Sequence, residues 1–183
     1  MSRAFNLGAG NLRAAGPVMA ALMLALLSVH GGLAQKITTE FDRSTDFTTF
    51  RTFAIRDVQL TSTNPALNSD LVKKRIQSEI ERAFTAKGLV LATGPSDLDV
   101  VCQFGSTSRE DVEVVRGAGR GTGPSVVRTP TTDGTLVIDL RTSTTRSLVW
   151  RAVATEQQRE AIKLQSKLGD MVKKAIAKYP PKK

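Results

Sequence analysis

The chain has 183 residues, with 26 lysines and arginines against 17 aspartates and glutamates, a formal net charge of +9. Its one histidine is His30 and its one cysteine is Cys102. This composition excludes an intramolecular disulfide and a histidine-ligated metal centre. Because no histidine follows His30 in the sequence, residues 31–183 cannot form a Ser-His or Cys-His nucleophilic pair.

The first 34 residues have the pattern of an export signal. Arg3 and Arg13 precede an apolar run at 18–29, and small residues stand at positions −3 and −1 ahead of Gln35. A permanent membrane anchor would need about 17–25 apolar residues, and a buried core helix is the other alternative. We predict a signal peptide over residues 1–34, cleaved between Ala34 and Gln35.

Gln35 stands where a lipoprotein signal would have its lipidated cysteine. We therefore predict a mature chain that is periplasmic or secreted, with no lipid and no transmembrane anchor. Residues 35–183 have the length of about one domain, which can bury a core without disulfides or metals. We predict no cofactor and no metal.

The mature chain keeps 24 basic residues against 17 acidic ones, a net charge of +7. Such a charge favours anionic envelope partners such as lipopolysaccharide, acidic glycans or phospholipid headgroups. Nucleic acid is not expected in that compartment. The alternative is a surface excess of lysine that only keeps the protein in solution.

Two strands and a helix come first in the mature chain. Residues 36–42 and 48–56 alternate as half-buried strands do, and the polar segment 57–68 with Asn64-Pro65 predicts a loop. A helix then begins after Asn68 or Ser69 as N-cap and ends before Gly88. Its apolar face comprises Val72, Ile76, Ile80, Ala83 and Phe84.

Residues 98–115 predict one long strand. Leu98, Val100, Cys102 and Phe104 share one face, which places Cys102 inside the protein as an inert core thiol. An intermolecular disulfide would instead require this thiol to be exposed.

A Gly-rich, basic segment at 116–134 interrupts the strands. Arg116, Arg120 and Arg128 alternate with glycines, as in loops whose amides bind phosphate. Those loops lead into a helix, whereas this one leads into another strand. We predict a mobile basic loop, with these three arginines as candidate anion-binding residues.

A hairpin over 134–155 carries the most ordered pattern. Leu136, Ile138 and Leu140, with Leu148, Trp150, Ala152 and Ala154, are predicted to face the helices. On the opposite face, Asp139 and Arg151 would form a cross-strand pair that contributes about 0.2–1 kcal/mol. The apolar Val137, Val149 and Val153 on that face, together with Arg151, form a candidate docking face.

The chain ends in a helix whose apolar stripe packs on the core. The stripe consists of Leu164, Leu168, Met171, Val172, Ala175, Ile176 and Tyr179. The order β-β-α-β-β-β-α predicts an α+β, two-layer sandwich: a mostly antiparallel five-stranded sheet with two helices packed on one face. The other face would be open to a partner, a ligand or a second copy in a homodimer.

Several segments together resemble one bacterial envelope family, domain-of-unknown-function family 4136. They are "DFTTFRTFAI", "LVKKRIQSEIERAFTAKGL", "SDLDVVCQF", "GTLVIDLRTSTTRSLVWRAVAT" and "MVKKAIAKYPPK". The resemblance covers the mature chain and implies a small exported α+β domain with no established activity and no catalytic residues to carry over. Many members are lipoproteins, and Gln35 departs from them.

Three functions follow as hypotheses. The first is a non-enzymatic, exported envelope domain that binds or organises an unknown envelope protein. The second is a salt-sensitive binder of an anionic envelope polymer or lipid, through the basic Gly-rich loop and the C-terminal lysines. The third is an enzyme, whose candidate carboxylates would be Asp99, Asp139 and Glu156.

Overall fold

A computed structural model describes residues 35–115 and 125–182. The predicted signal peptide, Arg116 and Arg120 therefore lie outside the described residues. In chain order the elements are β1 (Lys36–Phe41), a short 3₁₀ helix (Phe47–Thr49), β2 (Thr52–Leu60), α1 (Asp70–Thr85), β3 (Val90–Leu91), β4 (Leu98–Val115), β5 (Ser125–Thr142), β6 (Leu148–Gln158) and α2 (Ala161–Ile176).

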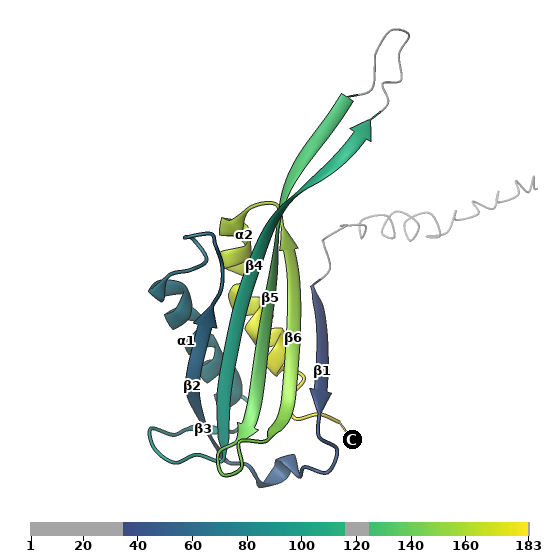
Figure 1. Cartoon of the computed structure of the whole chain (residues 1–183). Coiled ribbons are helices and arrows are strands. Elements are labelled where there is room, and N and C mark those ends of the chain that lie inside the picture. The colour runs from purple at the N-terminus through teal and green to yellow at the C-terminus, as the bar shows by residue number, and fades with distance from the viewer. Residues whose placement is uncertain (1–34, 116–124, 183) are drawn as a thin grey trace, which may run out of the picture. The chain divides into compact units, whose positions relative to one another are not determined.

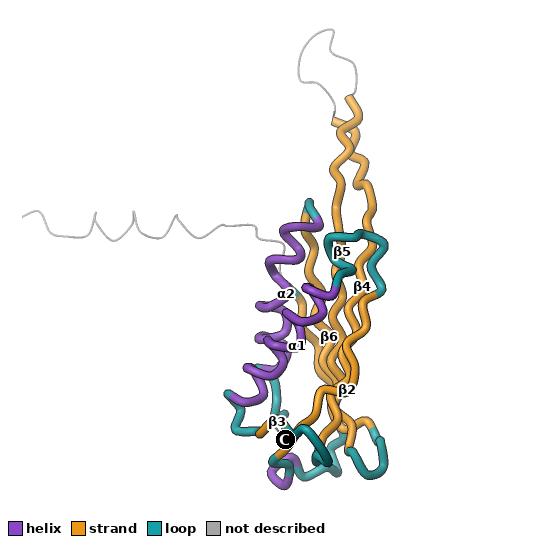
Figure 2. The backbone as a smooth tube through the Cα atoms, turned by 90° about the vertical axis from the view of Figure 1, so that its left-hand side faces the viewer, coloured by secondary structure: helices purple, strands orange, loops and turns teal. Residues whose placement is uncertain are grey.

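The strands form one six-stranded sheet in the order β1-β6-β5-β4-β2-β3 (Figure 1). Both helices lie on the same side of this sheet (Figure 2). The α+β prediction, with two helices on one face and the other face open, is confirmed. None of the helices within the described residues has the length and hydropathy of a membrane-spanning segment.

The prediction of a mostly antiparallel, five-stranded sheet is wrong in the number of strands and in the direction of β2 relative to its neighbours. The sheet is mixed, because β2 runs parallel to β3 and to β4. Helix α1 carries the chain back along the sheet before β3 and β4, and a strand that follows such a crossover runs parallel to the strand before it. β3 has only two residues, too few to show alternation in the sequence.

The first strand also pairs far from its neighbour in the chain. β1 lies antiparallel to β6, with Ile37 opposite Ala154 and Phe41 opposite Trp150. The short link between β1 and β2, which contains the 3₁₀ helix, therefore crosses from one edge of the sheet toward the other instead of forming a hairpin.

Helix α1 begins and ends where the sequence predicts. Ser69 is the N-cap, and its Oγ accepts a hydrogen bond from the Val72 amide at 3.4 Å. Gly88, with φ +88°, adopts the left-handed conformation just beyond the last turn. The predicted apolar face is buried at Val72, Ile76, Ile80 and Phe84.

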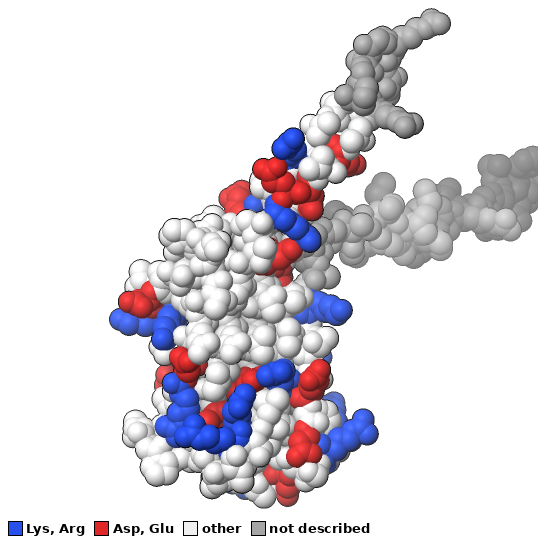
Figure 3. Space-filling view, viewed as in Figure 1, with Lys and Arg blue, Asp and Glu red and all other residues white. Residues whose placement is uncertain are grey.

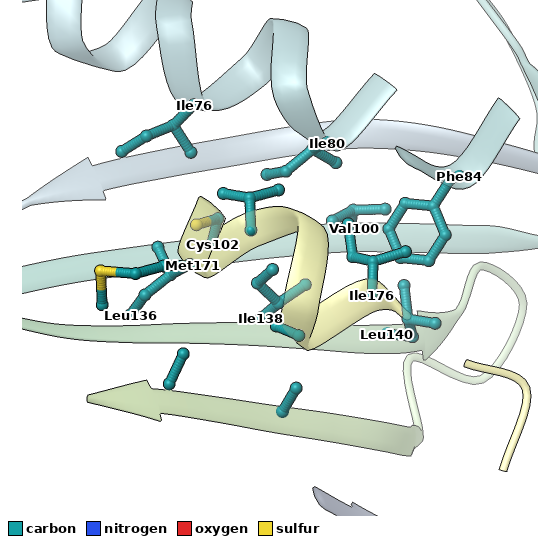
Figure 4. Close-up of a cluster of buried hydrophobic side chains, with 14 of the residues drawn as sticks. Ile76, Ile80, Phe84, Val100, Cys102, Leu136, Ile138, Leu140, Met171 and Ile176 are labelled. Atoms are coloured by element: carbon teal, nitrogen blue, oxygen red, sulfur yellow. The ribbon is translucent and has the colours of Figure 1, made fainter. Parts of the chain in front are cut away.

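The core lies between the two helices and the strands β2, β4, β5 and β6 (Figure 4). The predicted stripe of α2 is buried along its whole length, and Tyr179 packs edge-on against Trp150 with ring centroids 5.8 Å apart. Cys102 is fully buried, as predicted, and burial raises the pKa of its thiol to about 12.

Two predicted loops are partly strand. β2 continues to Leu60, because a register shift at Arg56 reverses the alternation and turns Val58 toward the helices, where it is 1% exposed. β5 begins at Ser125, so residues 125–134 of the predicted loop are strand. Pro130 tolerates this strand because it lies where β5 has no second neighbour.

β4 and β5 extend beyond the rest of the sheet. They pair from Leu98–Thr142 to Val115–Ser125, whereas β6 stops pairing with β5 at Thr132 and β2 stops pairing with β4 at Phe104. Residues 109–115 and 125–131 therefore form a two-stranded ribbon, which we call the arm (Figure 1). It carries five exposed valines: Val112, Val114, Val115, Val126 and Val127.

Candidate functional site

The candidate site is the open face of the sheet, the side turned away from α1 and α2. Alternation along the strands places Val101, Gln103, Thr135, Val137 and Val153 on this side, with Val137 paired to Val153. Figure 3 shows this central part of the face as uncharged, with charged residues toward both ends. The three valines are half-buried and Gln103 and Thr135 are exposed, so the centre of the face is an accessible, uncharged surface.

Three of the four residues predicted as a docking face lie on this side: Val137, Arg151 and Val153. The fourth, Val149, is only 3% exposed. A register shift pairs Trp150 with Leu140 but Leu148 with Arg141, so Val149 is an extra residue in the ladder. Such a bulge reverses the alternation. It removes Val149 from the accessible face and leaves Leu148, predicted to be in the core, 40% exposed.

Asp139 is held between two arginines at the charged end of the face. Arg151 donates from Nε to Asp139 Oδ1 at 2.6 Å and from Nη2 to Oδ2 at 2.7 Å. Arg141 Nη2 lies 3.7 Å from the same carboxylate. The hydrogen bonds to Asp139, with Glu40 across β1, raise the pKa of Arg151. The predicted cross-strand pair is therefore present, as a bidentate ion pair.

Asp99 forms a second polar centre on the neighbouring strand. Its Oδ1 accepts hydrogen bonds from Arg56 Nε at 2.7 Å, Ser143 Oγ at 2.8 Å and Ser96 Oγ at 3.1 Å. Burial alone would raise the pKa of this carboxyl, but the hydrogen bonds from Arg56, Ser143 and Ser96 outweigh it and hold the pKa below its ordinary value.

The three carboxylates considered for catalysis do not converge. Asp99 and Asp139 lie on the open face with their oxygens already hydrogen-bonded. Glu156 lies on the helix side of β6, beside a small cavity of about 150 Å³ lined also by Lys167 and Lys174. Gln158 Nε2 donates to its Oε1 at 2.6 Å. Asp99 and Asp139 are therefore held in ion pairs with arginines, and Glu156 lies apart from both.

The predicted anion-binding elements lie apart from each other. Arg128 is on the arm, where its closest acidic partner is Glu110 at 3.5 Å. Lys173 and Lys174 are in the last turn of α2, and this helix runs away from the arm toward the other end of the sheet (Figure 1). The described residues therefore do not combine these cations into one site. They also contain no group of three or more His, Cys, Asp or Glu side chains placed to hold a metal ion.

Two features were missed by the sequence analysis. The arm was the first, although valine-rich runs on both sides of a Gly-rich turn are a hairpin signal. The second is a cleft of about 670 Å³ along the outer edge of β2, between residues 57–61 and the first turn of α1. No local sequence pattern predicts this cleft, because it depends on which strand lies at the edge of the sheet.

Comparison with known proteins identifies the family. Residues 37–181 match the family described as "Domain of unknown function (DUF4136)". The chain belongs to the DUF4136 family. The resemblance seen in the sequence is thereby confirmed, and no curated protein matches this DUF4136 chain.

Several solved structures are similar to this chain at low sequence identity. A PDZ domain protein from Parabacteroides distasonis superimposes with a TM-score of 0.56 at 15% identity over 90% of this chain, which spans 40% of that protein. A DUF4136 family protein from Bacteroides thetaiotaomicron gives 0.47 at 14% identity, covering 80% of this chain and 96% of that one. The PelC dodecamer from Paraburkholderia phytofirmans gives 0.47 at 12%, covering 79% and 96%.

Proposed function

We propose that this DUF4136 protein is a non-enzymatic, exported domain of the cell envelope that binds a partner protein through the open face of its sheet. The observation that carries the proposal is the pairing of Val137 with Val153 at the centre of an uncharged surface that neither helix covers. Antiparallel strands tolerate a solvated face, and polar side chains usually occupy it. Valines at paired positions there suit a contact that excludes water.

The charged border of this surface supports a binding role over a catalytic one. Asp139 and Asp99 are 6% and 8% exposed, and each is hydrogen-bonded to an arginine. Hydrogen bonds hold the pKa of Asp99 below its ordinary value, so this carboxylate accepts a proton poorly at neutral pH. Fixed ion pairs at the rim of an apolar patch, by contrast, give an interface its orientation.

The test is a matched pair of lysine substitutions in the tagged, full-length chain. Val137→Lys places a charge at the centre of the open face, and Ser78→Lys places the same charge on the exposed side of α1. After cross-linking in the native host, we expect the partners captured with the wild type to be retained by S78K and lost by V137K. Equal capture by both variants, with unchanged far-ultraviolet circular dichroism, would refute the proposal.

The proposed export has its own test. The intact mass of the protein purified from its host should correspond to a chain that begins at Gln35. A retained Met1 would contradict cleavage after Ala34. Retention on lipopolysaccharide that falls steeply with ionic strength would instead favour the anionic-polymer hypothesis.

A further inference from the structure

The arm presents an unusual amount of apolar surface to water. Val112, Val114 and Val126 are 58–60% exposed, and Val115 and Val127 are 42% and 44% exposed. In the ladder Val114 lies opposite Val126, and Val115 and Val127 belong to the other face of the ribbon. A two-stranded ribbon with valines on both faces is only marginally stable by itself in water.

No strand within residues 35–115 and 125–182 pairs with either outer edge of the arm. The Thr61 amide donates to the Phe104 carbonyl at 2.9 Å, so the even-numbered residues of β4 direct their backbone groups away from β5. By the same alternation, the even-numbered residues of β5 direct theirs away from β4. Pro130 has no amide proton, so Val126 and Arg128 are the residues of this edge of the arm that can pair through both backbone groups.

The outer edge of β2 offers the complementary feature. β3 pairs with β2 only at Thr52 and Phe53, and no other described strand follows it on that side. Beyond the bulge at Arg56, Thr61 directs its amide toward β4, so Val58 and Leu60 direct their backbone groups outward. Val58 and Leu60 are among the residues that line the 670 Å³ cleft beside the first turn of α1.

Charge and length match between these two surfaces. The cleft is lined by Asp57 and Asp70 against the single cation Lys73. Arg128 is the one charged residue in 125–129, the part of β5 that can pair. Each edge offers two residues with outward backbone groups, Val126 and Arg128 on the arm and Val58 and Leu60 on β2.

A lipid surface fits the arm less well. Unpaired backbone groups along both edges of the ribbon would remain without hydrogen-bond partners in hydrocarbon, whereas strand addition satisfies them and covers the valines. The exposed Glu113 lies opposite Val127 among those valines, and its charge also disfavours insertion into a lipid surface.

We propose that the arm of one molecule adds, through residues 125–129 of β5, to the outer edge of β2 in a second copy of the same chain. The donor and acceptor surfaces are different parts of the molecule, so the contact is head-to-tail and leads to a ring or a filament rather than a two-fold dimer. It is separate from the open face and does not depend on the partner proposed for that face.

Disulfide trapping distinguishes the arrangements. Arg128→Cys supplies the arm thiol, and Asp70→Cys and Asp57→Cys supply cleft thiols on the two sides of β2. Thr38→Cys, on β1 at the other edge of the sheet, is the control. The native Cys102 is fully buried and does not compete. On mixing singly substituted mature chains under mild oxidation, we expect R128C to link to D70C or D57C and not to T38C.

Other outcomes of this experiment overturn the proposal. R128C that links only to itself indicates an arm-to-arm contact, and equal yields with T38C indicate random collision. As an independent measure, sedimentation of the wild type should show species heavier than the monomer that shift toward the monomer mass in Arg128→Glu. A chain that combines R128E with Asp70→Lys reverses both charges, and it should form the heavier species again. A wild type that remains monomeric at all concentrations contradicts the proposal.

Discussion

Arg151 and Asp139 face each other across β6 and β5 and form two hydrogen bonds of 2.6 and 2.7 Å on the open side of the sheet. The Asp139 side chain is 8% exposed and the Arg151 side chain 37% exposed. The pair therefore joins a nearly buried acceptor to a half-buried donor, and it fixes two central strands next to the uncharged patch.

Removing the Arg151 side chain should lower the free energy of unfolding by more than removing an exposed surface cation. Arg151→Met leaves Asp139 with only the Arg141 contact at 3.7 Å, and we expect the free energy of unfolding to fall by about 1–3 kcal/mol. Lys163→Met is the control, because its pair with Glu160 is exposed on both sides, and it should change stability by less than about 1 kcal/mol. Urea denaturation measures both, and equal losses would contradict this assignment.

Asp99 makes the folding stability depend on pH in the acid range. Its pKa in the folded state lies below the ordinary value of 3.8, so the unfolded state binds more protons as the pH falls and folding stability falls with it. The contribution is complete above the ordinary pKa and is lost as the pH passes through the folded pKa. In Asp99→Asn, we expect the loss of unfolding free energy between pH about 5 and about 2 to be smaller than in the wild type.

A second carboxylate contributes in the same pH range. Hydrogen bonds from the backbone amides of Arg51 and Thr52, and from the Thr52 hydroxyl, lower the pKa of Asp97. D99N should therefore flatten the acid limb of the stability curve only in part, and the double variant with Asp97→Asn should flatten it further. Parallel curves for the wild type and the double variant would contradict both assignments.

Two glycines should respond oppositely to alanine. A Cβ at Gly134 would lie 2.8 Å from both Cδ atoms of the buried Leu164, so Gly134→Ala should destabilise the protein by about 1–3 kcal/mol. When Gly134→Ala and Leu164→Ala are combined in one chain, their effects on stability should be non-additive.

Gly169 should respond in the opposite direction. It lies inside α2, where the atom nearest to an added Cβ would belong to Glu79 at 3.5 Å, so Gly169→Ala should stabilise the protein by about 0.4–1 kcal/mol. Thermal unfolding measures both.

Tyr179 contributes through its ring rather than its hydroxyl. The hydroxyl is buried without a hydrogen-bond partner among the described residues, and burial raises its pKa to about 12. The ring contacts Phe47, Phe84 and Trp150 edge-on. We expect Tyr179→Phe to leave stability unchanged or raise it, and Tyr179→Ala to cost about 3–5 kcal/mol. A large loss in Y179F, seen by chemical denaturation, would show that the hydroxyl has a partner.

The buried thiol of Cys102 should be chemically silent in the folded protein. It is fully buried, and its pKa of about 12 leaves almost no thiolate near neutral pH. Iodoacetamide should therefore label native protein only at the rate of unfolding, and denatured protein at once. Rapid labelling of the native protein, followed by intact mass, would contradict the burial of this residue.

The sequence by itself determined which residues face the core along most of the chain. The helical stripe from Leu164 to Ile176, the cap at Ser69 and the inward side of β4 at Cys102 all follow local rules. Alternation and capping depend on neighbours a few residues apart, so one chain shows them without any knowledge of its fold. The placement of Asp139 and Arg151 on one face was predicted in the same way.

The tertiary structure decided which strands are neighbours and where their register breaks. The parallel pairing of β2, the pairing of β1 with β6 and the bulges at Arg56 and Val149 all depend on contacts between residues far apart in sequence. A bulge inserts one residue and reverses the side-chain pattern without any local signal. The docking face therefore lost Val149, and the free edge of β2 and the arm became visible only once the whole sheet was assembled.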